Sequence, residues 1–264
     1  MTMVAATDSF RFRLRGMTGL VIRNLEDEHL SFESLLGRTP PGNPEATLAM
    51  SYSCCFVQFA GRNVLIDAGL DARQVEGCLG GIGIAPAAVS DVLITHGDRD
   101  HVLGLMREDG SAAYPGAQCV LHRELWEGWA SGAIVLRDEA SRLPAALEAR
   151  VRLVTGGDRP LDGVEVIDAP GHGVGHLAFA MESEDQTLLH VGDALLHTVF
   201  VEYPEEEIPA EDDSRRAAET RIRLLSLAAK RGALVAGSHF PFPGLGQVER
   251  SAVGFRWLPL EQAQ

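Results

Sequence analysis

Alternating and continuous runs of apolar residues predict a chain that is rich in short strands. Residues 53–59 and 62–66 are predicted to form a hairpin around Ala60 and Gly61. Further strands are predicted at residues 10–23, 91–95, 118–121, 151–154, 164–167, 177–181, 187–191, 233–236 and 254–258. Because strands outnumber helices in both halves of the chain and the helices lie between groups of strands, we expect two sheets packed face to face with helices outside.

A helix is predicted most clearly at residues 214–230, where apolar positions recur every three or four residues and Glu219 stands four residues before Arg223. Shorter helical segments are predicted at residues 71–90, 102–106, 123–129 and 138–149. Residues 202–213 have the composition of an acidic loop. A long irregular loop is predicted at residues 24–48, which contain three prolines; a functional loop and a simple surface excursion are both consistent with this composition.

The length of 264 residues and the apolar content of 45% are those of an ordinary globular protein. We expect a single domain over residues 1–264, in which residues 1–50 supply an N-terminal strand and the long loop, and residues 51–264 form the core. The 37 acidic and 23 basic residues give a net charge of −14. This charge argues against nucleic acid or an anionic membrane as a partner, since both require basic patches.

The cysteines and the N-terminus indicate the compartment. Cys54, Cys55, Cys78 and Cys119 form no C-x-x-C pair, so we expect buried free thiols, which are typical of a reducing environment. The first twenty residues lack the apolar segment of a signal peptide, and no stretch of eighteen residues is both uncharged and apolar. A soluble cytoplasmic protein is therefore predicted.

Candidate metal ligands are concentrated at residues 95–101, which read Thr-His-Gly-Asp-Arg-Asp-His directly after a predicted strand. Side chains alternate along extended backbone, so His96, Asp98 and Asp100 can converge on one point, and His101 can reach it from the next turn. Imidazole and carboxylate ligands in one tight corner suit one or two divalent metals. A polar loop without metal would have a similar composition.

Three later segments repeat this arrangement of a strand followed by a glycine-flanked His or Asp. They contain His172 and His176, then Asp193, then His239. Glycine beside a ligand lets the backbone approach a small central ion without a clash. Each segment alone is weak evidence, but their order and their place at strand ends strengthen the prediction of a metal site.

The order T-H-x-x-x-D-H, D-x-P-G-H-x-x-G-H, G-D and S-H resembles the metallo-β-lactamase fold superfamily of hydrolases, from about residue 53 to the C-terminus. The segments 238–246 and 254–257 are similar to the branch that holds methyl parathion hydrolase and quorum-quenching N-acyl-homoserine lactonases. This resemblance implies an α/β fold of four layers, the αββα sandwich, with a metal site at the edge between two mixed sheets. Relatives in this branch are often dimers, so a homodimer is an expectation.

The resemblance also implies roles for individual residues. One metal would be bound by His96, Asp98 and His172, a second by Asp100, His101 and His239, with Asp193 bridging the two. Asp67 would support the metal-binding loop without binding metal, Thr95 would hydrogen-bond within that loop, and His176 would be structural. Asp100 and His197 are the candidate catalytic residues, and Phe240 and Phe242 are the candidate walls of an apolar substrate pocket.

Asp98 departs from the usual H-x-H-x-D-H motif of the family, which has a second His at this position. We expect zinc, but a carboxylate there makes the site harder and more anionic, which lowers the preference for zinc and makes manganese or iron possible. We favour two divalent metal ions. The alternatives are that only the second position is filled, or that a degenerate site binds a ligand without turnover.

The function implied by the resemblance is that of a metal-dependent hydrolase in which a metal-bound hydroxide opens a lactone or a carboxylic ester, a small-molecule substrate. A phosphotriester or a β-lactam is the alternative substrate, since fold does not determine function. Outside hydrolysis, the rivals are an iron-dependent thiol dioxygenase and a non-catalytic metal- or ligand-binding protein.

Overall fold

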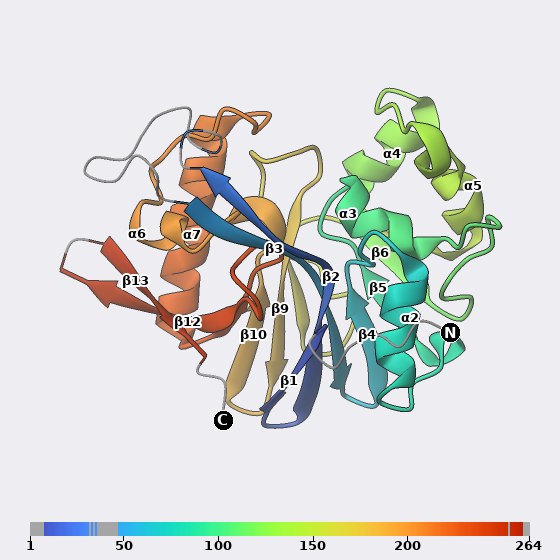
Figure 1. The fold of residues 1–264 in the computed structure, drawn as a ribbon, viewed down its shortest axis with the longest axis horizontal. Coiled ribbons are helices and arrows are strands. Elements are labelled where there is room, and N and C mark those ends of the chain that lie inside the picture. Colours follow the sequence, from blue (N-terminus) through green and yellow to red (C-terminus); the bar gives the residue numbers. More distant parts are fainter. Residues whose placement is uncertain (1–7, 32, 34, 36–46, 253, 261–264) are drawn as a thin grey trace.

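Two mixed β-sheets packed face to face form the centre of the protein (Figure 1). The computed structural model describes residues 8–31, 33, 35, 47–252 and 254–260. The first sheet has the order β1 (Ser9–Leu14), β2 (Met17–Ser31), β3 (Thr47–Phe59), β4 (Arg62–Ile66), β5 (Asp91–Leu93), β6 (Gln118–His122) and β7 (Val151–Val154). The second has the order β13 (Gly254–Pro259), β12 (Leu245–Ser251), β11 (Leu234–Ala236), β10 (Gln186–His190), β9 (Leu177–Ser183) and β8 (Val164–Asp168).

Antiparallel and parallel pairs occur in both sheets. β1 to β4 are antiparallel neighbours, whereas β4 to β7 are parallel. Among the described strands of the second sheet, β10 and β11 form the one parallel pair and the other neighbours are antiparallel. The predicted hairpin between β3 and β4 is confirmed, and its turn has left-handed backbone at both Ala60 (φ 48°) and Gly61 (φ 74°), as the favoured two-residue turn requires.

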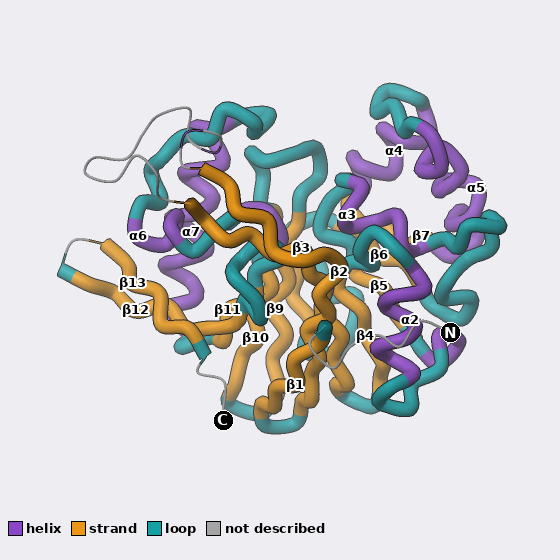
Figure 2. Tube along the Cα trace, in the orientation of Figure 1, coloured by secondary structure: helices purple, strands orange, loops and turns teal. Residues whose placement is uncertain are grey.

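Alternation of side chains along the strands produces the layers. In β4, Val64 and Ile66 point into the core between the sheets, whereas Leu65 points to the outer face of the first sheet. That outer face is covered by α2 (Ala72–Gly80), α4 (Arg123–Ser131) and α5 (Leu143–Leu147), and the outer face of the second sheet by α6 (Val199–Glu202) and α7 (Ser214–Arg231). Figure 2 shows the strands in the middle with helices on both sides. The predicted αββα sandwich is confirmed.

Short 3₁₀ segments connect the main elements. They are η1 (Pro86–Ala88), η2 (Leu103–Leu105), η3 (Asp138–Arg142), η4 (Glu148–Arg150) and η5 (Gly192–Ala194). The predicted helix at residues 138–149 is therefore broken into η3, α5 and η4, with Pro144 near the start of α5, where its missing N–H costs least. All four cysteines are buried and free, as predicted.

Three predictions of secondary structure were wrong. Part of the predicted loop at 24–48 is strand, because β2 continues to Ser31 opposite β3 with two register shifts that accommodate its polar run; residues 32, 34 and 36–46 lie outside the described part. The helix predicted at 102–106 is replaced by α3 (Arg99–Val102) and η2, where Gly104 packs tightly on the Ala68 carbonyl. β12 was missed, since its sequence has few apolar residues.

Within the described ranges, no helix is both long enough and apolar enough to cross a bilayer.

Candidate metal centre

The seven side chains predicted as metal ligands lie together at one end of the two sheets. His96 and Asp98 follow β5, and α3 supplies Asp100 and His101. The remaining three follow strands of the second sheet: His172 after β8, Asp193 in η5 after β10, and His239 after β11. The ends of strands from both sheets therefore bring residues that are up to 143 positions apart to one point.

Possible ligand atoms form three overlapping groups, each with all its atoms within 4.8 Å of one another. The groups are His96, Asp98 and His172; Asp100, His101 and His239; and His96, His101 and Asp193. The first two groups coincide with the two metal positions that the family resemblance implied. The third group joins them through Asp193.

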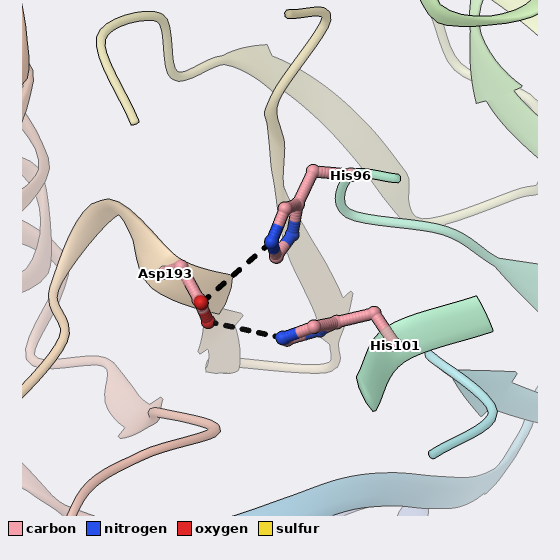
Figure 3. A group of neighbouring side chains, drawn as sticks. All are labelled: His96, His101 and Asp193. Carbon is pink, nitrogen blue, oxygen red and sulfur yellow. Dashed lines mark ion pairs between the residues drawn. The ribbon is translucent and has the colours of Figure 1, made fainter. Parts of the chain in front are cut away.

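Asp193 faces the imidazoles of His96 and His101, with one carboxylate oxygen directed at each ring (Figure 3). Its Oδ1 is 3.3 Å from His101 Nε2, and its Oδ2 is 3.6, 3.5 and 3.0 Å from the Nε2 atoms of His96, His172 and His239. The side chain is only 4% exposed. A buried carboxylate that faces four imidazole nitrogens has the geometry of a bridging ligand.

Asp98 and Asp100 lie on opposite sides of this bridge. Asp98 Oδ2 is 3.5 Å from both His96 Nε2 and His172 Nε2, and Asp100 Oδ2 is 3.3 Å from both His101 Nε2 and His239 Nε2. The Asp98 side chain is 61% exposed, against 21% for Asp100. The carboxylate that distinguishes this chain from the usual motif thus stands at the solvent side of the centre.

The chemistry and spacing of these groups fit divalent metal ions. His96 Nε2, His101 Nε2 and Asp193 Oδ1 are buried, and each lacks a hydrogen bond within the described residues. Nitrogen and oxygen ligands at zinc distances and tetrahedral angles are about 3.3–3.6 Å apart. Most of the N···O separations around Asp98, Asp100 and Asp193 fall in this range.

Electrostatics couple the imidazoles to the carboxylates. Burial alone would raise the pKa of Asp193, but the imidazoles of His239, His101 and His96 hold it well below its usual range. Burial alone would lower the pKa of His239, but Asp193 and Asp100 raise it to about 10. Without metal, the carboxylates therefore hold protons on neighbouring imidazoles, and a metal ion would displace them.

Asp67 holds the metal-binding loop from behind. Its Oδ1 accepts a hydrogen bond from Thr95 N, and its Oδ2 accepts from Thr95 Oγ1 and from His101 Nδ1, each at 2.8 Å. The Thr95 hydroxyl also lies 3.0 Å from His96 Nδ1. These bonds leave the Nε2 atoms of His96 and His101 directed at the centre.

His176 and His239 are held in the same way by backbone groups. His239 Nδ1 donates to the Ser51 carbonyl of β3 at 2.9 Å, and His176 Nε2 accepts from the backbone N–H of Asp193 at 3.0 Å. His176 belongs to none of the three ligand groups, and its structural role stays a prediction.

His197 and Phe240 are both buried, and the catalytic role expected of His197 stays a prediction. His197 is buried, accepts a hydrogen bond from Val199 N through Nδ1, and belongs to none of the ligand groups. Phe240 is completely buried in the core, where its ring packs edge-on against Trp257 and closely against Gly237. It therefore does not wall an open pocket. Phe242 is half-buried, with the Arg23 guanidinium 5.0 Å from its ring centre.

Two features of the site had no signal in the sequence. A pocket of about 370 Å³ opens beside His96, Asp98 and His172. Its other lining residues are Gly97, Leu125, Ala133, Ile134, Gly173, Val174, Ala210 and Asp212. Tyr52 of β3 packs its ring edge-on against His239, with ring centres 4.8 Å apart. Both features depend on contacts between segments that are distant in the chain.

Comparison with known proteins shows the family to which the chain belongs. The family model described as the metallo-beta-lactamase superfamily matches residues 49–239, a span that holds all seven predicted ligands. The chain belongs to this superfamily. No curated protein matches the sequence.

Several solved structures share the fold of this superfamily member. The dizinc quorum-quenching lactonase AidC, in complex with a product, has a TM-score of 0.83 at 18% identity, covering 97% of this chain and 98% of its own. The hydrolase AbOPH has a TM-score of 0.82 at 22% identity, covering 98% and 100%. A probable metal-dependent hydrolase from Staphylococcus aureus has a TM-score of 0.77 at 17% identity, covering 94% and 99%.

Proposed function

We propose that this protein is a metal-dependent hydrolase that opens a lactone or a carboxylic ester. The observation that carries the proposal is the buried Asp193 carboxylate facing four imidazole nitrogens at 3.0–3.6 Å, with Asp98 and Asp100 beside it. His96, Asp98 and His172 would hold one ion, and Asp100, His101 and His239 the other. Divalent ions in such a centre lower the pKa of water and polarise the carbonyl oxygen of an ester.

Asp100 is the group that we assign to proton transfer. Burial alone would raise its pKa, but His101 and His239 hold the pKa below the usual range, so Asp100 is a carboxylate at neutral pH. In the hydrolysis of a lactone, water adds to the carbonyl carbon, the ring C–O bond breaks, and the alkoxide takes up a proton. Asp100, which is partly exposed at the centre, can accept the proton of the water and return it to the alkoxide.

The pocket beside Asp98 and His172 supports a neutral organic substrate. Leu125, Ile134 and Val174 give it apolar contacts next to the carboxylate groups. The net charge of −14 and the carboxylates at the pocket would repel a polyanion. Among structures of the same fold, one is an N-acyl homoserine lactone hydrolase with the product N-hexanoyl-L-homoserine bound at its catalytic metal centre. A lactone with an apolar substituent is therefore the substrate class we propose.

Zinc is the metal we propose, with manganese or iron tolerated because of Asp98. Support comes from the description of AidC as a dizinc lactonase. A homodimer and a cytoplasmic location stay predictions.

Metal analysis combined with a substrate panel tests this function. The purified protein should bind two ions per chain after zinc loading and should hydrolyse lactones or aryl esters, with activity lost on chelation and restored by zinc. A phosphotriester, a β-lactam and oxygen uptake with a thiol complete the panel. Asp193→Asn should abolish turnover. Less than one bound metal per chain after loading with zinc, manganese and iron would contradict the proposal.

A further inference from the structure

The four imidazoles of the candidate centre differ in how their second ring nitrogen is held. His101 Nδ1 is bonded to Asp67, His239 Nδ1 donates to Ser51 O, and His96 Nδ1 lies 3.0 Å from Thr95 Oγ1. His172 Nδ1 is also buried, but it makes no hydrogen bond within the described residues. Histidines that ligate metals almost always donate their other N–H to a carboxylate, a carbonyl or water. A partner for His172 is therefore expected close by.

Glu211 has a carboxylate oxygen, Oε2, that could accept the hydrogen bond of His172 Nδ1. It lies in the acidic loop before α7, and the next residue, Asp212, donates its backbone N–H to the His172 carbonyl at 3.2 Å. Asp213 N donates to Gly171 O at 2.9 Å, so this loop is bound to the backbone that carries His172. Glu211 is buried, and its Oε2 makes no hydrogen bond within the same described ranges.

The other oxygen of Glu211 is held by a buried arginine. Arg221 of α7 is 0% exposed and donates from Nη1 to Glu211 Oε1 at 2.7 Å. It also donates from Nε to Pro204 O at 3.1 Å and from Nη2 to Glu206 O. The arginine thus ties the acidic loop to α7 and leaves Glu211 Oε2 free for another donor.

Electrostatics agree with this arrangement. Burial raises the pKa of Glu211, and the charges of Arg221 and His172 act against that rise. A buried ion pair is costly to desolvate and contributes little net stability, so stabilisation alone does not account for the Glu211–Arg221 pair.

We propose that Glu211 is the positioning carboxylate of His172, and that its Oε2 accepts the hydrogen bond of His172 Nδ1 through one buried water. This inference rests on the proposed metal site. Asp67 orients His101, a ligand of one metal position, by accepting the hydrogen bond of its Nδ1. Glu211 orients His172, a ligand of the other metal position, in the same way through the water. The acidic loop is thereby coupled to one of the two metal positions.

Metal titration of the full-length, metal-stripped protein tests this role, by calorimetry with zinc and by the visible spectrum with cobalt. Glu211→Gln should weaken the binding of one of the two ions by roughly 10- to 100-fold and leave the other unchanged. Glu211→Asp, which keeps the charge, should recover part of the affinity. Glu205→Gln is the matched control, because it removes one charge from an exposed position of the same loop. It should leave the affinity for both ions unchanged.

Double variants show which of the two metal positions Glu211→Gln weakens. In a protein that already carries Asp98→Asn, Glu211→Gln should reduce the free energy of zinc binding by less than it does in the unmodified protein, because both residues act on the same metal position. In a protein that carries Asp67→Asn, the two losses of binding free energy should add. If the unmodified protein binds two ions and Glu211→Gln binds both with unchanged affinity and cobalt spectrum, the role of Glu211 is overturned while the proposed function stands. If the unmodified protein binds no metal, the proposed function fails and takes this role with it.

A direct measurement covers the case in which Glu211→Gln fails to fold because Arg221 loses its partner. In the unmodified, zinc-loaded protein labelled with [¹⁵N]histidine, His172 should carry its proton on Nδ1, and that proton should exchange slowly with solvent. A His172 protonated on Nε2, or an Nδ1 proton that exchanges as fast as that of an exposed imidazole, would overturn the proposal.

Discussion

The Asp67 carboxylate lies 2.8 Å from His101 Nδ1 and accepts its hydrogen bond. Asp67 comes directly after β4, in the left-handed region at φ 58°, which is costly for a residue other than glycine. It is fully buried, and the same carboxylate accepts two hydrogen bonds from Thr95. One strained residue directly after β4 thereby orients the loop after β5 and one imidazole of the candidate centre.

Asp67→Asn should lower the affinity for the ion at the Asp100, His101 and His239 position by roughly 10- to 100-fold, because the amide no longer supports the His101 tautomer with Nε2 free. Zinc titration of the metal-stripped protein measures this. Asp91→Asn is the control, because Asp91 is also fully buried at the start of a neighbouring strand but pairs with Arg62. It should lower stability and leave zinc affinity unchanged. Equal zinc affinity for Asp67→Asn and the unmodified protein would contradict the support role.

Asp98→His should raise zinc affinity at the position shared with His96 and His172 and reduce the tolerance for manganese, because imidazole suits zinc better than a carboxylate does. Competition between zinc and manganese, followed by metal analysis, measures the preference. Asp109→His, in an exposed loop outside the ligand groups, controls for the added imidazole. An unchanged metal preference would show that Asp98 is not a ligand.

The stability of the metal-free protein should depend on pH through His239. Asp193 and Asp100 raise its pKa from 6.5 to about 10, against the effect of burial. The folded state therefore binds this proton more tightly than the unfolded chain does, so the stabilisation is complete below pH 6.5 and is lost as the pH rises toward about 10. Melting temperatures measured with a chelator should fall across this interval.

Zinc binding should show the opposite trend, because an imidazole must lose its proton before it can bind metal. Zinc affinity should rise with pH over the same interval, with protons released on binding. His239→Gln should reduce the pH dependence of the metal-free melting temperature, and the part that remains should come from His101 and His172, whose pKa values neighbouring carboxylates also raise. A melting temperature of the metal-free protein that stays constant or rises would contradict the raised pKa of His239.

Phe240→Ala should destabilise the fold by about 3–5 kcal/mol, because it removes a fully buried ring and leaves a cavity beside Trp257. Urea unfolding of the metal-free protein measures the change. Phe242→Ala, at a half-buried ring two residues away, should cost clearly less. A loss for Phe240→Ala no larger than that for Phe242→Ala would mean that Phe240 does not occupy the core.

Local patterns in the sequence predicted much of the fold and of the candidate centre. Most strands were predicted from short apolar runs. His and Asp residues next to glycines at the predicted strand ends allowed His96, Asp100 and Asp193 to be predicted as metal ligands without a structure. The failures came where local composition and tertiary environment disagree. The polar residues after Arg23 read as loop but continue β2, because β3 supplies the hydrogen-bond partners through two register shifts.

The apolar and ligand patterns along the chain thus determined the two-sheet sandwich and the residues that could bind metal, since side-chain periodicity and ligand chemistry are local properties. Only the tertiary structure decided which second residue holds each imidazole. Asp67 reaches His101 across 34 positions, Ser51 reaches His239 across 188, and the loop with Glu211 packs on His172. The tertiary structure also places the Phe240 ring in the core. Such pairings depend on how the sheets pack, because hydrogen bonds and buried contacts form between neighbours in space, wherever they lie in the chain.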